Sequence, residues 1–282
     1  MSVRPKKRLG QHFLADPEAV RRIVDAVAAP AGARVVEIGP GEGALTAGLL
    51  ARYPGLVALE VDPEAVAHLR ARFPALDVRQ ADVLAADWRA LAEGADGERG
   101  SANGDGDAVP AASASGTAAA GPPPLHVVGN LPYYITSPIL FALLDARRHV
   151  ARAVVMVQKE VADRLAAPPG SKAYGTLSVY FALYARTSLL FDVPRQAFRP
   201  PPKVESAVVA VDFAAAEPPA VPFQAVQRTV RAAFGQRRKM LRNSLGPLAQ
   251  AAGADLGDYA TRRPEAVSPA DFVHLARLLA VD

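Results

Sequence analysis

The chain has 282 residues and no cysteine. Without thiols it cannot form a disulfide scaffold, a thiolate metal site or a cysteine nucleophile, and such composition is typical of a reducing compartment. It also lacks an apolar run near the roughly 20 residues of a membrane span. The basic segment at residues 1–10 is not followed by the apolar region of a secretory signal. We therefore expect a cytoplasmic protein that has no membrane partner and no metal-ligand cluster.

Charge is unevenly distributed along the chain. Residues 1–22 hold six Lys/Arg against two Asp/Glu, and residues 195–282 hold twelve against eight. The middle, residues 23–194, holds fourteen against eighteen, and the whole chain has a net charge of +4. Basic ends around an acidic middle favour a polyanionic partner. Charge alone is equally well explained by solubility.

The first part of the chain alternates between strand and helix patterns. Apolar periodicity and Asp-Pro helix starts predict helices at 17–28, 44–52 and 63–73 and strands at 34–38, 56–61 and 76–80. That alternation indicates a parallel sheet with helices on its faces. Further strands are predicted at 125–130, 151–158, 182–193 and 204–213, which makes about seven. No long helix separates the last two, so one strand should be antiparallel.

Two stretches depart from this alternation. Residues 93–124 are rich in Gly, Ala, Ser and Pro and predict a disordered surface insertion. After residues 217–222 the pattern is helical to the end, including a helix at 269–280. We therefore expect an α/β domain at residues 1–214 and a small all-helical domain at residues 215–282.

A glycine-rich turn follows the first strand of the sheet, in VVEIGPGEGALT (35–46). Gly39 and Gly41 allow unusual dihedrals and a close approach of a ligand to the backbone. Glu60 and Asp82 end the next two strands, where they could accept from ribose hydroxyls and from an adenine amino group. The pattern fits both a nicotinamide cofactor and S-adenosylmethionine. As isolated residues, the two acids would be solvated caps.

The segment GNLPYYITSPI (129–139) follows a later strand. Its proline ends regular structure. The Asn130 side-chain oxygen and the Leu131 carbonyl are neutral acceptors, which could make the amino group of an adenine a better nucleophile toward a sulfonium methyl donor. Tyr133 could stack on the base, a contact worth about 1–3 kcal/mol. The segment therefore indicates methyl transfer by alignment, without a metal or a strong base. A proline turn with a capping Asn is the alternative for the isolated motif.

The chain closely resembles the ribosomal RNA adenine N6,N6-dimethyltransferases, which modify two adjacent adenosines in a hairpin near the 3′ end of small-subunit rRNA. The matching segments, in chain order, are KKRLGQHFL (6–14), VVEIGPGEGALT, GNLPYYITSPIL, VVMVQKEVADRLAA (154–167), YGTLSV (174–179), FRPPPKVESAVV (198–209) and FGQRRKMLRNSL (234–245). Tyr134 stands where the family usually has Asn, and His12 stands where many members have Asn. The resemblance implies a Rossmann-like class I methyltransferase fold and transfer of methyl groups from S-adenosylmethionine to adenine N6 of 16S rRNA.

The resemblance also implies roles for single residues. The implied cofactor-binding residues are Gln11, His12, Leu14, Gly39, Gly41, Glu60, Asp82 and Asn130. The target amine and base would be held by Asn130, Leu131, Pro132 and Tyr133. Phe198 would stack on the other face of the base, with core packing as the alternative. Arginine suits phosphate recognition, and the expected RNA-binding residues are Lys6, Lys7, Arg8, Arg228, Arg231, Arg237, Arg238, Lys239 and Arg242.

The implied partner is 16S rRNA, alone or in an immature 30S subunit, and nothing in the sequence demands a second copy of the chain. Two alternatives stay open beside this function. One is a large-subunit rRNA methyltransferase that confers antibiotic resistance, although PPPKVESA and FGQRRKMLRNSL favour the small-subunit enzymes. The other is a non-catalytic ribosome assembly factor.

Overall fold

The structure, a computed structural model, describes residue 6 and residues 10–94 and 124–280. Its centre is a seven-stranded sheet with the strand order β4-β3-β2-β5-β6-β9-β7. The strands are β2 (Val35–Ile38), β3 (Val57–Glu60), β4 (Asp77–Gln80), β5 (Leu125–Asn130), β6 (Val150–Gln158), β7 (Arg186–Val193) and β9 (Ser206–Asp212). Strand β9 runs antiparallel to both of its neighbours, β6 and β7, and the other six strands run in one common direction. The prediction of seven strands with one antiparallel is confirmed.

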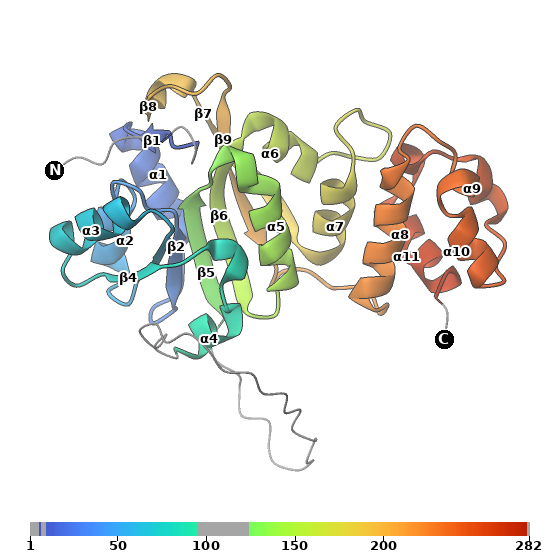
Figure 1. Ribbon diagram of the computed structural model, residues 1–282, viewed down its shortest axis with the longest axis horizontal. Coiled ribbons are helices and arrows are strands. Elements are labelled where there is room, and N and C mark those ends of the chain that lie inside the picture. The colour runs from blue at the N-terminus through green and yellow to red at the C-terminus, as the bar shows by residue number, and fades with distance from the viewer. Residues whose placement is uncertain (1–5, 7–9, 95–123, 281–282) are drawn as a thin grey trace, which may run out of the picture.

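Helices cover both faces of the sheet (Figure 1). One face packs against α1 (Pro17–Val27), α2 (Thr46–Arg52) and α3 (Pro63–Arg72). The other packs against α4 (Trp88–Glu93), α5 (Thr136–Asp145), α6 (Lys159–Leu165) and α7 (Thr176–Tyr184). Because both faces are covered, the central strands are apolar almost throughout. No helix among the described residues is both long and apolar enough to cross a membrane.

Two of the three helices on the first face begin where their Asp-Pro signals predicted, whereas α2 begins at Thr46, two residues after its predicted start at 44. Asp16 caps α1 by accepting from the Glu18 N–H, and Asp62 caps α3 by accepting from the Glu64 N–H. In each case proline follows at the first helical position, where its missing N–H has no intrahelical partner to lose. The predicted helices at 17–28 and 63–73 are therefore confirmed to within one residue at their ends.

Four helices follow β9: α8 (Phe223–Gly235), α9 (Leu241–Ser244), α10 (Gly246–Ala251) and α11 (Pro269–Leu278). Of these, α8 and α11 pack against α7, and α9 packs against α8 and α10, at one end of the molecule (Figure 1). The Phe223 ring lies 6.1 Å from that of Tyr180 and 5.1 Å from that of Tyr184. One hydrophobic cluster includes residues of the sheet and of these helices. The division into domains at residues 214 and 215 stays a prediction.

The predicted strand at 182–193 is wrong at its start, because α7 continues to Tyr184 and β7 begins at Arg186. Helix α7 lies between the sheet and the C-terminal helices, so most of its residues are buried. An all-round apolar helix lacks the one-sided pattern that distinguishes it from a strand. A short pairing of β1 (Phe13–Leu14) with β8 (Phe198–Arg199) was not predicted. The expected insertion at 93–124 lies almost wholly outside the described residues.

Strands β2 and β5 approach closely at Gly129, which pairs with Ile38. A Cβ on Gly129 would lie 2.6 Å from the Ile38 carbonyl oxygen, which is backbone and has no room to move. Gly129→Ala should therefore lower the free energy of unfolding by about 1–3 kcal/mol, as measured by urea denaturation. Gly55→Ala is the matched control, since a Cβ there meets nothing within 4 Å. Equal stability of the two variants would contradict the close approach.

Strand β2 carries a buried acid, Glu37, which is 1% exposed and accepts a hydrogen bond of 2.7 Å from the Thr46 hydroxyl. Burial raises the pKa of Glu37 to about 8, although the Thr46 bond opposes the shift. The folded state therefore holds a proton that the unfolded state has released, and stability falls as pH rises from about 4.5 to about 8. Glu37→Gln should flatten this slope, which contributes at most about 1.4 kcal/mol per pH unit. Urea denaturation at pH 5, 7 and 9 measures the slope, and an unchanged slope in the variant would contradict the burial argument.

Candidate active site

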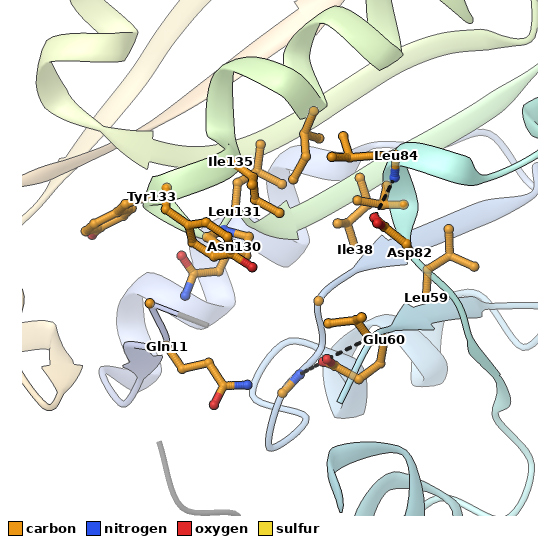
Figure 2. Close-up of a pocket in the computed structure, with 18 of the residues that line it drawn as sticks. Gln11, Ile38, Leu59, Glu60, Asp82, Leu84, Asn130, Leu131, Tyr133 and Ile135 are labelled. Atoms are coloured by element: carbon orange, nitrogen blue, oxygen red, sulfur yellow. Dashed lines mark hydrogen bonds between the residues drawn. The ribbon is translucent and has the colours of Figure 1, made fainter. Parts of the chain in front are cut away.

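A cavity of about 260 Å³ opens at the carboxyl ends of β2, β3, β4 and β5. Carboxyl ends of parallel strands are where open α/β sheets bind their ligands. The predicted residues that line it are Gln11, His12, Gly39, Gly41, Glu60, Asp82, Asn130, Leu131, Pro132 and Tyr133. Figure 2 shows Asn130, Leu131 and Tyr133 on one side of this space and Glu60 and Asp82 on the other. Segments from five parts of the sequence therefore converge on one cavity.

Apolar residues that sequence reasoning missed make up much of the remaining wall. They are Ile38, Leu59, Val61, Val83, Leu84, Ile135 and Ile139. Val61 and Leu84 are 50% and 43% exposed, which is unusual for large apolar side chains. In the sequence, Val61 and Leu84 carry no signal that distinguishes them from other apolar residues near strand ends. Apolar walls with a few polar groups suit a flat heteroaromatic ligand such as a purine.

A second cavity, of about 270 Å³, adjoins the first and shares Phe13, Gly39 and Asn130 with it. Leu14 lines this second space rather than the first, as does the buried Glu37. Glu37 is another site-lining residue that sequence reasoning missed. Its signal was a single acid inside an otherwise apolar strand, where charge is costly.

Glu60 is 4% exposed, and its carboxylate is held by three backbone N–H groups. One oxygen accepts from Val61 and Asp62 at 2.9 Å each, and the other accepts from Gly41 at 3.1 Å. Burial raises the pKa of Glu60 even though these bonds favour the charged form. A carboxylate has about four acceptor positions, so one position stays open toward the cavity. An open acceptor here fits a ribose hydroxyl.

Asp82 follows β4 and is exposed at the far end of the cavity. One of its oxygens accepts from the Leu84 N–H at 2.9 Å, which turns the chain into a short 3₁₀ segment. The other oxygen accepts none of the hydrogen bonds found among the described residues, so it fits the amino group of an adenine. The cavity therefore suits an adenosine-containing cofactor on the chemistry of its acceptors.

The glycine-rich turn joins this cavity to the N-terminal segment, by which we mean Lys6 and residues 10–14. Gly39 and Gly41 have φ of 61° and 56°, a region that other residues rarely adopt. A Cβ on Gly41 would lie 2.8 Å from the Phe13 ring. The absence of a side chain therefore lets the N-terminal segment lie directly against the turn.

Asn130 ends β5, and its side-chain amide is oriented by a residue far away in the sequence. Its Nδ2 donates to the His12 carbonyl oxygen at 3.0 Å. Because a carbonyl only accepts, the amide oxygen Oδ1 must be the atom that remains for a ligand. The neighbouring Leu131 N–H donates to Met156 at 3.0 Å, whereas no hydrogen bond within the described residues ends on the Leu131 carbonyl. Two neutral acceptors therefore stand next to each other at the cavity.

Tyr133 lies between the cavity and β9. Its hydroxyl lies 2.5 Å from that of Ser206, and burial raises its pKa. Its ring stacks on the His12 ring, with centroids 5.6 Å apart and planes at 28°. His12 is held in turn by its Nδ1, 2.8 Å from the Pro200 carbonyl. Tyr134, the residue that departs from the family pattern, is 55% exposed at the cavity mouth.

Phe198 lies apart from the other predicted target residues. It is 1% exposed and packs in the hydrophobic cluster that also contains residues of α1, α2 and α3. It lines neither of the two cavities. Its strand partner is Leu14, so it anchors the N-terminal segment through the pairing of β1 with β8. In this conformation the packing alternative describes Phe198, and its stacking role stays a prediction.

The predicted RNA-binding residues occupy three different environments. Lys6 is paired with carboxylates, while Lys7 and Arg8 lie outside the described residues. Arg228 donates to the Leu279 carbonyl at 2.7 Å and so caps the end of α11. The remaining five predicted residues are exposed: Arg231, Arg237, Arg238, Lys239 and Arg242. None of these five takes part in the ion pairs found in the described part of the chain.

Known proteins resemble the chain over almost its whole length. The family described as "Ribosomal RNA adenine dimethylase" matches residues 3–258. The "Ribosomal RNA small subunit methyltransferase A" of Salinibacter ruber is 47% identical over 280 residues, which cover 98% of this chain and 85% of that protein.

Two solved structures share the fold. A dimethyladenosine transferase from Plasmodium falciparum superposes with a TM-score of 0.67 at 22% identity, covering 94% of this chain and 96% of that one. The 23S rRNA methyltransferase ErmE has a TM-score of 0.59 at 26% identity, covering 95% of this chain and 99% of that one. The match over residues 3–258 and the 47% identity leave no doubt about descent: the chain belongs to the ribosomal RNA adenine dimethylase family.

Proposed function

We propose that the protein transfers methyl groups from S-adenosylmethionine to N6 of two adjacent adenosines in a hairpin near the 3′ end of 16S rRNA, giving N6,N6-dimethyladenosine. The observation that carries this proposal is the pair of neutral acceptors at the cavity, Asn130 Oδ1 and the Leu131 carbonyl. S-adenosylmethionine supplies a methyl group on a sulfonium centre, a good leaving group. The protein then has to hold the amino group in line with that methyl.

The acceptor pair suits an amino nitrogen rather than a hydroxyl. An adenine amino group has two hydrogens, and two acceptors can each take one of them. Accepting both hydrogens favours a pyramidal nitrogen whose lone pair is available. Pro132 does not compete for this role, because its carbonyl already accepts from the Ile135 N–H at 3.1 Å and the Thr136 hydroxyl at 3.0 Å.

The target base must leave its stack to reach Asn130. Tyr133 offers a ring face for it at the cavity, and the hydrogen bond between the Tyr133 and Ser206 hydroxyls fixes the position of that ring. In this conformation His12 stacks on Tyr133. A base that enters on the same face would replace the imidazole, whereas a base on the other face would leave it in place.

A surface rich in cations supports the proposal that the substrate is an RNA. Three loops meet there: Arg237 donates to the Lys172 carbonyl at 2.8 Å, and the Leu241 N–H donates to the Arg262 carbonyl at 2.8 Å. We call this surface the cationic loops, and its members are Lys172, Arg237, Arg238, Lys239, Arg242, Arg262 and Arg263, all exposed. Sequence reasoning missed Lys172, Arg262 and Arg263, which come from other loops.

In the view of Figure 1, the α6–α7 loop and the end of α8 lie toward the same edge of the molecule as the carboxyl ends of the parallel strands. One folded RNA could therefore contact the cationic loops while one of its bases enters the cavity. Phosphate contacts of this kind position an RNA without reading its sequence. We further propose that the partner is 16S rRNA, alone or in an immature 30S subunit in the cytoplasm, and that the protein acts as a monomer.

The alternative functions receive less support. The small-subunit enzyme of Salinibacter ruber is 47% identical, against 26% for the large-subunit enzyme ErmE. The acceptor pair argues against a purely structural assembly factor, which would need no such groups. Family membership removes the nicotinamide oxidoreductase suggested by the glycine-rich turn.

Mass spectrometry of rRNA fragments tests the proposal directly. Purified protein and S-adenosylmethionine are incubated with 30S particles that lack the two dimethyladenosines, and separately with 50S particles. The expected product is a fragment near the 3′ end of 16S rRNA that has gained four methyl groups, two on each of the two adjacent adenosines. Methyl groups found only in 23S rRNA, or none at all, would refute the proposed substrate.

Asn130→Ala removes the amide acceptor and also the bond to the His12 carbonyl. We expect kcat for methylation to fall about 10²-fold or more, because alignment of the amine is lost. The dissociation constant for S-adenosylmethionine, measured by calorimetry, should change little. Asn243→Ala, at an exposed position of α9, is the control and should retain activity. Equal losses of catalysis and of cofactor affinity would remove the role assigned to Asn130.

Neutralising two of the cationic loop residues should weaken RNA binding through lost counterion release. For Arg238→Gln combined with Lys239→Gln, we expect the slope of log Kd against log salt to fall by about 1–2. Filter binding of a 16S hairpin RNA at several KCl concentrations measures this slope. The control is Arg21→Gln on α1, an exposed cation that is already paired with Glu18. An unchanged slope in the double variant would place the RNA elsewhere.

A further inference from the structure

Lys6 is held against the edge of the sheet by two carboxylates. Its Nζ lies 2.7 Å from Asp62 Oδ1 and 3.1 Å from Glu64 Oε2. The Asp62 side chain is 0% exposed, and that of Lys6 is 21% exposed. An ion pair with one fully buried partner is screened much less by water and salt than a surface pair.

The same pair contacts both walls of the cofactor cavity. On one side, the Asp62 N–H donates to Glu60 Oε1 at 2.9 Å. On the other, the Lys6 backbone N–H donates to Gln11 Oε1 at 2.9 Å. Glu60 and Gln11 both line the cavity. The Lys6–Asp62 contact therefore joins the N-terminal segment to the strand end that carries the expected ribose acceptor.

Asp62 depends on Lys6 for compensation of its charge. Burial on its own raises the pKa of Asp62, but the Lys6 ammonium and the Glu64 N–H outweigh burial and hold that pKa below its usual value. The second oxygen, Oδ2, is buried and has no hydrogen-bond partner among the described residues. A buried carboxylate with a single cation beside it makes that cation hard to displace.

This environment does not suit a phosphate contact by Lys6. A phosphate at Lys6 Nζ would lie beside Asp62 and Glu64, and like charges at such distances repel. To reach RNA, Lys6 would have to leave both carboxylates and strand the Asp62 charge. The cationic loops present exposed cations with no such cost.

We propose that Lys6 and Asp62 are positioning residues for the cofactor. Their contact holds Gln11 against the Glu60 side of the cavity and thereby sets the affinity for S-adenosylmethionine, in place of the RNA contact that the sequence suggested for Lys6. The inference rests on the proposed function only in taking this cavity as the cofactor site.

Calorimetric titration with S-adenosylmethionine, in the absence of RNA, tests the inference on Lys6→Met, Asp62→Asn and the double variant. Met keeps the aliphatic stem of Lys6, and Asn keeps the helix cap of Asp62. We expect each single variant to raise the dissociation constant about tenfold, and the double variant to add less than about twofold, because the two groups act as one unit. Arg21→Gln, which breaks an exposed pair on α1, should leave the constant unchanged.

Turnover at saturating cofactor and the affinity for the hairpin RNA separate a positioning role from other roles. Both should stay within about twofold of the wild type in Lys6→Met. A weaker RNA complex with unchanged cofactor affinity would overturn the inference and return Lys6 to the RNA interface. An unchanged cofactor dissociation constant in Lys6→Met would overturn it as well.

Thermal unfolding of each variant accompanies the titrations. If Asp62→Asn does not fold, the cofactor dissociation constants of Lys6→Met and Glu64→Gln serve as the test. The Lys6 and Glu64 side chains are more exposed than that of Asp62, so their substitution disturbs the fold less. A wild-type protein that binds S-adenosylmethionine but methylates no 16S rRNA would refute the proposed substrate and leave this inference standing. Wild-type protein that does not bind the cofactor would refute both.

Discussion

The arrangement of the active site depends on the hydrogen bond from the Asn130 amide to the His12 carbonyl, which spans 118 residues of sequence. An amide presents either an acceptor or two donors, and a simple rotation about its terminal bond exchanges them. Donors aimed at the amino group of an adenine would repel it. By accepting from the Nδ2 group, the His12 carbonyl leaves Oδ1 open toward the cavity. A backbone atom of the N-terminal segment therefore determines which atom of the Asn130 amide is presented at the end of β5.

Under the proposed function the N-terminal segment belongs to the catalytic unit, and several contacts hold it in place. Its strand β1 pairs with β8, its Phe13 ring lies against Gly41, and Lys6 pairs with Asp62. Each contact reaches a different element of the methyltransferase fold. One segment therefore contributes to both sides of the cavity, because Gln11 and His12 both line it.

Three carboxylates lie buried around this site, and each is stabilised in a different way. Glu37 accepts from the Thr46 hydroxyl, and burial favours its protonated form. Glu60 accepts three backbone N–H groups, and Asp62 is compensated by the Lys6 ammonium. Unpaired charges are costly in such surroundings, so this concentration of acids marks where the fold gives up stability for binding. It also accounts for part of the acidic balance of the middle of the chain.

Local signals in the sequence were sufficient for most of the fold and for the polar half of the site. Asp16-Pro17 and Asp62-Pro63 started helices, apolar runs marked the strands, and the turn at Gly39 and the Asn130 motif lay at strand ends as expected. These features depend on neighbours within a few residues, which is why a single sequence reveals them. The start of β7 was wrong because α7 is apolar on all sides, and only its position between two layers explains that pattern.

Contacts between distant segments could not be predicted in this way. The burial of Phe198, the pairing of Lys6 with Asp62, the capping of α11 by Arg228 and the convergence of Lys172 and Arg262 on one surface all depend on which loops meet. The sequence by itself determined which chemical groups the protein carries at its strand ends. Only the tertiary structure decided which of those groups face one another, since a side chain's partner is set by chain packing and not by its neighbours in sequence.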